Sequence, residues 1–258
     1  MRKNELKRRL QSGEATIASW LSVAHPTIAE IMGQAGFDCL IVDMEHGILD
    51  IEGVHSLVLT LAGTPASSLV RVPWNDPVII KRVLETGALG LLVPQVSSAE
   101  EVAQAVRAVR YPPQGIRGIG CQRPAGYGAW FDEYLGAANE ELVVAVQIET
   151  ARAIENLDAI LSVEGLDLIF IGANDLAANM GLFNQTQHPQ VQEAIRHILV
   201  AAKKAKVPVG LMATDADDAN RRMAEGFQFI GVGHDVGLLS SACRGLCRRV
   251  TRDVFPAR

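Results

Sequence analysis

Two acidic residues follow two apolar runs in the middle of the chain and point to a divalent metal site. Glu149 comes directly after the apolar run at residues 142–148, and Asp175 follows the run at residues 166–171. Short apolar runs bounded by polar chain are typical of strands buried on both faces. Two such strands, parallel and adjacent, would place both carboxylates over the same end of a sheet. Divalent cations such as Mg²⁺ prefer oxygen ligands. We therefore expect Glu149 and Asp175 to bind a divalent metal ion.

Further polar residues follow other apolar runs, and together they would form an acidic site that also contains an arginine and histidines. The candidates at strand ends are Asp43, Glu45, His46, Arg71, Gln147, Glu149, Asn174, Asp175, His234 and Asp235. Structural alternatives stay open at this point: helix capping for Glu149 and Asp175, an ion pair for Arg71, and a structural role for His46. For His234 and Asp235 the structural role is the favoured interpretation.

The composition indicates a folded domain and excludes several classes of protein. Of 258 residues, 48% are hydrophobic and 21% are charged, which is enough for a full core. A net charge of −5 and a sequence pI of about 5.7 give no electrostatic basis for binding nucleic acid. No apolar run has the length of a membrane span, and the basic N-terminus lacks the apolar segment of a signal peptide. We expect the basic residues between Arg2 and Arg9 to form a solvated helix face.

The four cysteines suggest a reducing compartment. Cys243 and Cys247 are one helical turn apart, but no second Cys or His pair completes a zinc site. We expect these two residues, with Cys39 and Cys121, to be packing thiols of a cytoplasmic protein.

A repeated alternation of strand and helix organises the whole chain. Because parallel strands need helical crossovers, the alternation predicts a parallel α/β sheet. Eight units in about 250 residues favour a single closed (β/α)8 barrel over residues 1–258. A dinucleotide-binding fold is rejected, because the glycine-rich segment 115–120 follows a helix and two prolines instead of a strand. The expected strands are 16–22, 39–42, 69–72, 90–96, 142–148, 166–171, 208–213 and 229–232. The expected helices are 26–34, 51–61, 77–86, 98–110, 152–161, 174–180, 189–204, 215–225 and 236–250.

The alternation is interrupted at residues 111–139, which are rich in Gly, Pro, Arg and aromatic residues. We expect a long loop there, because such segments in compact domains are usually functional or mobile. Whether it lines the substrate site, forms a subunit contact or simply packs on the surface stays open.

Several motifs, spread in order over nearly the whole chain, resemble the HpcH/HpaI family of metal-dependent (class II) pyruvate aldolases. The most specific are FDCLIVDMEHG at residues 37–47, YPPQGIRG at 111–118, VQIET at 146–150 and IGANDL at 171–176. Shorter matches are VRVP at residues 70–73, LVP at 92–94 and VGHD at 232–235.

The resemblance implies a barrel of the phosphoenolpyruvate/pyruvate type, forming hexamers (trimers of dimers) with a swapped last helix. It also implies reversible cleavage of 4-hydroxy-2-oxo acids to pyruvate and an aldehyde through a metal-bound pyruvate enolate. Mg, Mn or Co would be the metal. The implied roles are metal ligation by Glu149 and Asp175, substrate binding by Gln147, Arg71, Asn174 and Asp175, and catalysis by His46 and Arg71. Glu85 stands where the family has an Asp that raises the basicity of the histidine, and either Glu85 or Asp43 would orient the His46 ring.

Other functions remain open at the level of sequence. None of these strand ends offers a lysine for a Schiff base, which favours the metal route. A related decarboxylase or CoA-thioester lyase would need a CoA-binding segment that is not evident. A non-catalytic metabolite-binding barrel is supported only by the change to Glu at position 85. The aldehyde half of the substrate cannot be read from the sequence.

Overall fold

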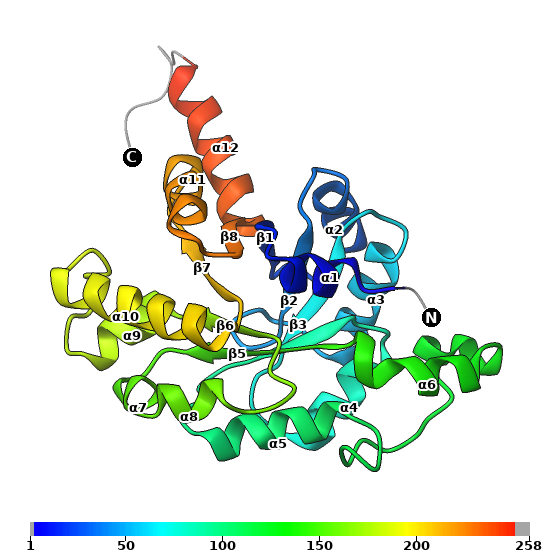
Figure 1. Ribbon diagram of the computed structural model, residues 1–258. Helices are drawn as coiled ribbons and strands as arrows, with labels where there is room; N and C mark the ends of the chain where they lie inside the picture. Colours follow the sequence, from blue (N-terminus) through cyan, green and yellow to red (C-terminus); the bar gives the residue numbers. More distant parts are fainter. Residues whose placement is uncertain (1–2, 251–258) are drawn as a thin grey trace.

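The computed structural model describes residues 3–250 and confirms the closed (β/α)8 barrel (Figure 1). Eight parallel strands pair in sequence order, and the last strand closes on the first. Each predicted strand is present within a few residues of its expected position. The strands are β1 (Thr16–Leu21), β2 (Cys39–Asp43), β3 (Ser67–Arg71), β4 (Gly90–Val93), β5 (Val143–Ile148), β6 (Leu168–Ile171), β7 (Val209–Ala213) and β8 (Phe229–His234).

Helices surround the barrel, and several begin where a polar side chain caps the first turn. Ser98 and Glu101 form a reciprocal capping box at the start of α5, and Gly87 follows α4 with a φ of 88°. The helices are α1 (Glu5–Ser12), α2 (Pro26–Gly33), α3 (Ile51–Leu61), α4 (Pro77–Glu85), α5 (Ala99–Val109), α6 (Phe131–Glu141), α7 (Ala151–Glu155), α8 (Leu157–Leu161), α9 (Ala173–Asn179), α10 (Pro189–Ala205), α11 (Ala216–Glu225) and α12 (Asp235–Arg249), with the 3-10 helix η1 (Arg123–Gly128).

The core has two layers, one inside the barrel and one between the strands and the helices. Strands β2 to β6 are buried along their whole length, as expected for strands covered on both faces. Inside the barrel, Phe170 packs edge-on against Trp20 and Phe229, with ring centroids 5.7 and 6.1 Å apart. These rings fill the barrel interior below the ends of the strands.

Helix α1 packs into this interior, so one expectation about the N-terminus was wrong. Leu6 and Leu10 belong to the interior cluster. Lys7 is buried between them and pairs with Asp167 at 3.0 Å, while its Nζ also donates to the Leu142 carbonyl at 2.8 Å. The basic face of α1 is therefore solvated at Arg8 and Arg9 but not at Lys7. Arg2 lies outside the described residues.

Two expected segments differ from the structure. Residues 111–139 are not a continuous loop, because η1 and α6 occupy the second half, with Tyr134 and Ala138 of α6 buried. The expected helix at residues 152–161 is two short helices, α7 and α8, separated at Asn156. The Asn156 side chain donates to the Ser97 carbonyl at 2.8 Å, which ties this break to the segment after β4.

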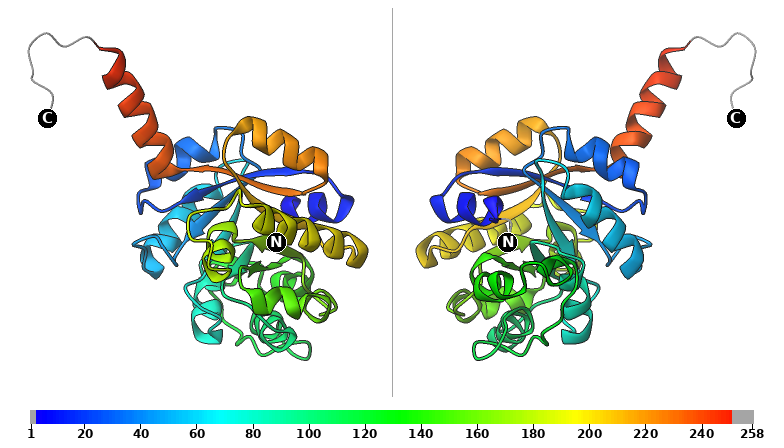
Figure 2. Two further views of the ribbon diagram at one scale, coloured as in Figure 1. Left: turned by 90° about the vertical axis from the view of Figure 1, so that its left-hand side faces the viewer. Right: turned by 90° about the vertical axis from the view of Figure 1, so that its right-hand side faces the viewer.

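Helix α12 projects away from the barrel (Figure 2) and carries exposed apolar side chains. Val236, Leu239, Leu246 and Val250 are 49 to 59% exposed. The expectation of packing thiols holds only for buried Cys39, because the other three cysteines are exposed in this chain. No helix among the described residues has the length and apolarity to cross a membrane.

Candidate active site

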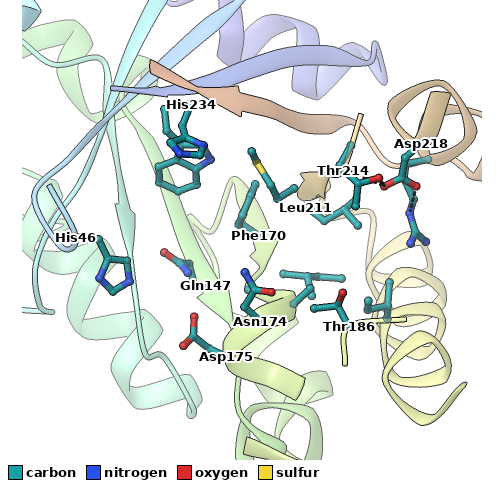
Figure 3. A pocket seen from close by; sticks show the side chains of 18 of the residues that line it. His46, Gln147, Phe170, Asn174, Asp175, Thr186, Leu211, Thr214, Asp218 and His234 are labelled. Carbon is teal, nitrogen blue, oxygen red and sulfur yellow. Dashed lines mark hydrogen bonds and ion pairs between the residues drawn. The ribbon is translucent and has the colours of Figure 1, made fainter. Parts of the chain in front are cut away.

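Strand register brings most of the candidate residues to the carboxyl ends of the strands. Asp43 pairs with Arg71 across β2 and β3, and Trp20 pairs with His234 across β1 and β8. A cavity of about 590 Å³ opens there (Figure 3). Barrels of this architecture have their active sites at this end. The sequence candidates that line the cavity are Asp43, His46, Arg71, Gln147, Asn174, Asp175 and His234.

Arg71 is held from three sides. Asp43 accepts hydrogen bonds from its Nε at 2.9 Å and its Nη2 at 2.7 Å, and Gln147 Oε1 accepts from Nη1 at 3.2 Å. Its guanidinium also lies 4.3 Å from the centroid of Trp20. Glu45 pairs with Nη1 at 3.0 Å without hydrogen-bond geometry. Because three of the five N–H groups are hydrogen-bonded, the fixed guanidinium keeps donors for a substrate oxygen.

Glu149 is a buried carboxylate, 1% exposed, directly behind the cavity. It accepts hydrogen bonds from the Gln95 backbone at 2.8 Å and from Gln147 Nε2 at 2.6 Å. Gly172 makes room for it, since a Cβ at that position would overlap Glu149 Oε2. Burial raises the pKa of Glu149 to about 7; the Gln95 hydrogen bond opposes this rise, and the charges of Asp175 and Glu45 add to it.

These residues fit a divalent cation. A buried carboxylate beside two further acids lacks a positive charge, and a cation there would favour its ionised form. The available ligands are carboxylate oxygens, which suit Mg²⁺ or Mn²⁺. Within residues 3–250 no group of three or more His, Cys, Asp or Glu side chains is placed to hold a metal. Glu149 and Asp175 would therefore share the ion with substrate and water.

His46 lies at the mouth of the cavity with its side chain 65% exposed (Figure 3). Its Nε2 is 3.9 Å from Glu45 Oε2. Asp43 Oδ1 accepts hydrogen bonds from the backbone of Glu45 at 3.0 Å and of His46 at 3.3 Å. Asp43 therefore orders the backbone of this segment instead of orienting the imidazole ring.

The structure does not bring Glu85 to His46 within one chain. Glu85 ends α4, just before the start of β4, so it lies toward the opposite end of the barrel from the cavity. Its Oε1 accepts a hydrogen bond at 3.1 Å from Arg117, which is fully buried against Tyr111 and Tyr134. The expected orienting contact is not formed within one chain, because a helix running back along the barrel places its last residue away from the cavity.

The structure distinguishes some of these structural alternatives. Glu149 does not cap α7; Thr150 does, by accepting from the Ala153 backbone at 3.0 Å. Asp175 lies in the first turn of α9 and also lines the cavity, so both interpretations remain compatible with it. Asp235 has the favoured structural role, since its Oδ2 accepts from the backbones of Ser22 and Val23 at 2.7 Å. His234 instead lies exposed at the cavity.

Sequence reasoning missed Trp20 and the part of the cavity that the later loops build. Trp20 belongs to the end of β1, so the strand-end argument applied to the first strand would have found it. The cavity is also lined by Thr186 and Thr214, which lie in loops, and by Gln192, which lies near the start of α10. No spacing signal marks those residues, because the loops after β6 and β7 follow no period.

The fold and the site together define a (β/α)8-barrel enzyme with an arginine- and carboxylate-lined centre. The family model described as HpcH/HpaI aldolase/citrate lyase matches residues 16–242. The chain therefore belongs to the HpcH/HpaI aldolase/citrate lyase family. It is an aldolase, a carbon–carbon lyase.

Three relatives illustrate this membership. A 5-keto-4-deoxy-D-glucarate aldolase of Klebsiella pneumoniae subsp. pneumoniae is 39% identical over 94% of this chain and 95% of its own. The crystal structure of an HpcH/HpaI aldolase/citrate lyase family protein from Burkholderia cenocepacia J2315 is 36% identical, with a TM-score of 0.92 over 95% of this chain and 98% of that one. Citrate synthase SbnG is 29% identical, with a TM-score of 0.84 over 94% of this chain and 96% of its own.

Proposed function

We propose that this chain reversibly cleaves 4-hydroxy-2-oxo acids to pyruvate and an aldehyde with the help of a divalent metal. The observation that carries the proposal is the convergence of His46, Arg71, Gln147, Glu149 and Asp175 at one end of the barrel. An arginine fixed by a carboxylate, beside buried acids, suits a reaction in which negative charge develops on a 2-oxo group.

In the cleavage direction, His46 accepts the proton of the substrate 4-hydroxyl, through a water. As the C3–C4 bond breaks, the electron pair of that bond moves to the C2 oxygen and leaves the enolate of pyruvate. Arg71 faces this oxygen with a charge that stays fixed, because Asp43 and Trp20 hold the guanidinium. The proton that His46 has taken is then returned to C3 through a water, which completes pyruvate, and the aldehyde leaves.

Glu149 and Asp175 would hold the metal ion. When bound, a divalent cation supplies Lewis-acid stabilisation of the oxygen on which charge develops. Gln147 links the two halves of the site, since its Oε1 accepts from Arg71 and its Nε2 donates to Glu149. Its amide therefore fixes the position of the Arg71 guanidinium relative to the proposed metal-binding carboxylate of Glu149.

The relatives guide the choice of substrate. A relative that is 39% identical over nearly the whole chain is a 5-keto-4-deoxy-D-glucarate aldolase. We infer that this chain acts on a 4-hydroxy-2-oxo acid of the same kind, derived from a sugar acid. The volume of the cavity, about 590 Å³, lies within the range of ~300–1,000 Å³ that is typical of sites for drug-sized ligands. The cavity therefore has room for a substrate larger than pyruvate.

We also infer that the chain assembles into a homohexamer through α12. Exposed apolar side chains on a helix that projects from the barrel support this inference, since such surfaces mark interaction sites.

The test is pyruvate release from 4-hydroxy-2-oxo acids by protein stripped with EDTA and then supplied with Mg²⁺, Mn²⁺ or Co²⁺. We expect release only after metal is added, and its loss in Glu149→Ala. Equal release without metal would refute the metal site. No release with any metal and any substrate length would refute the proposed cleavage of 4-hydroxy-2-oxo acids.

A further inference from the structure

The cavity extends well beyond the residues that hold the 2-oxo acid. His46, Gln147 and Asp175 lie at one end, and Thr186 and Thr214 at the other (Figure 3). Phe170 and Leu211 lie between the two ends in the same view. If pyruvate occupies the end near Arg71, the remaining space receives the aldehyde half of the substrate.

The charged groups of this second part are already paired. Arg222 contacts Asp218 at 3.3 Å, donates to Glu225 at 3.2 Å and donates to Gln192 Oε1 at 3.0 Å. The other arginine of the lining, Arg71, is paired with Asp43 and Glu45. In the proposed reaction Arg71 is committed to the 2-oxo end of the substrate, and the charge of Arg222 is already balanced by Asp218 and Glu225.

His234 is different, because its imidazole has no hydrogen-bond or ion-pair partner among the described residues. Its ring is exposed and faces the cavity, across from Gln147 and Asn174 (Figure 3). The chain makes room for the ring at Gly237, where a Cβ would lie 2.5 to 2.9 Å from three of its atoms. An imidazole in this position offers one N–H donor when neutral and two when protonated.

We propose that His234 binds the carboxylate of the aldehyde half and so selects substrates that carry a second carboxylate. This inference rests on the proposed function and names its substrate class. A substrate such as 5-keto-4-deoxy-D-glucarate ends in a carboxylate at both ends, and retro-aldol cleavage leaves one of them on a hydroxylated aldehyde. Asn174, which is exposed beside Asp175, offers an amide to the hydroxyl groups of the same half.

The test compares two substrates that differ in one group. The first is 5-keto-4-deoxy-D-glucarate, and the second is its analogue with CH₂OH in place of the carboxylate of the aldehyde half. We expect His234→Ala to lower kcat/KM for the diacid by about 10- to 100-fold, mainly through KM, which is the range for a lost hydrogen bond to a charged group. For the neutral analogue we expect a change of less than about threefold. His234→Gln keeps an N–H donor and should recover part of the loss.

His197→Ala is the matched control, because His197 is exposed on the outer side of α10 and does not line the cavity. An equal loss for both substrates in His234→Ala would assign His234 a structural role and overturn the inference. No loss for the diacid in His234→Ala would also overturn the inference. Activity of the wild type would in that case leave the proposed function intact. An inactive wild type would overturn the proposed function and the inference together.

Discussion

Arg71 is the residue on which the proposed chemistry most depends, and its surroundings explain why lysine would not replace it. Asp43 is itself buried and receives two parallel N–H groups from the guanidinium. Lysine offers a single point charge on a flexible stem and cannot reproduce this geometry or the contact with the Trp20 ring.

We therefore expect Arg71→Lys to lower kcat/KM by about 100-fold or more, since it removes charge-assisted hydrogen bonds worth ~1.5–3 kcal/mol each. Steady-state kinetics with saturating Mn²⁺ would measure the loss, and circular dichroism would check that the barrel remains folded. A folded variant with a loss below threefold would contradict this role.

The raised pKa of Glu149 predicts a pH-dependent metal site. With a pKa of about 7, the carboxyl is largely protonated at pH 6 and largely ionised at pH 8. Because metal binding requires the ionised form, the affinity of the metal-free protein for Mn²⁺ should be about tenfold lower at pH 6 than at pH 8. Titration calorimetry at both pH values measures this ratio, and Glu149→Gln should abolish the dependence. A constant affinity would argue against Glu149 as a ligand.

The raised pKa of Glu149 also affects the free energy of unfolding. The direction of the pKa shift fixes the sign of this pH dependence. The folded carboxyl holds its proton up to about pH 7, whereas the ordinary value is 4.5. The folded state therefore binds more protons than the unfolded state between these values. The metal-free protein should lose stability as the pH rises through this window and should regain it when metal is added.

At the scale of elements, the end of β6 approaches Glu149 closely enough to need glycine. Gly172 has an ordinary φ of −81°, so alanine would not strain the backbone there. Its Cβ would instead push the Glu149 carboxylate away from its position.

We expect Gly172→Ala to weaken Mn²⁺ binding and to lower kcat by at least about tenfold, because a displaced ligand costs well over 1 kcal/mol. The matched control is Gly136→Ala on α6, where the structure leaves open space around the new Cβ. Unchanged metal affinity in Gly172→Ala would show that Glu149 is not held where the site requires it.

The elements also show what sequence could and could not predict. All eight strands were predictable because each is an apolar run bounded by polar chain. Helix α6 was not, because FDEYLGAANEE buries only Tyr134 and Ala138 and shows little apolar periodicity. The burial of Lys7 depends on Asp167, which is distant in sequence, and such pairing leaves no local signal.

Within the site, the strand-end argument identified Arg71, Gln147, Glu149 and Asp175, because parallel strands all deliver their ends to one side. The same argument could not place Glu85, since a helix end is not a strand end. Sequence alone did not separate the adjacent residues His234 and Asp235, of which Asp235 bonds to the backbone and His234 is exposed at the cavity.

At the scale of the whole molecule, α12 predicts assembly. Val236, Leu239, Leu246 and Val250 are spaced at intervals of three, seven and four residues, which places them along one face of the helix. An exposed apolar face of this kind is stable in water only when a partner covers it.

We expect light scattering after gel filtration to give six copies of the 27.8 kDa chain for the wild type and smaller species for the double variant Leu239→Asp, Leu246→Asp. The charged side chains would be unpaired in the buried interface. Lys204→Glu on the exposed end of α10 is a charge-changing control. A monomeric wild type, or a variant that stays hexameric, would contradict assembly through α12.

Different segments of the chain line the two parts of the cavity, and this separation has a consequence for how substrate specificity can evolve. In the proposed reaction, the groups that handle the 2-oxo acid come from the ends of β2, β3 and β5 and, for Asp175, from the first turn of α9, whereas Thr186 and Thr214 come from the loops before α10 and after β7. Exchange of these two segments between homologues would therefore alter which aldehydes are accepted and leave carbon–carbon bond cleavage untouched. The barrel in effect separates two heritable traits, reaction and acceptor range, so that selection can act on one without disturbing the other.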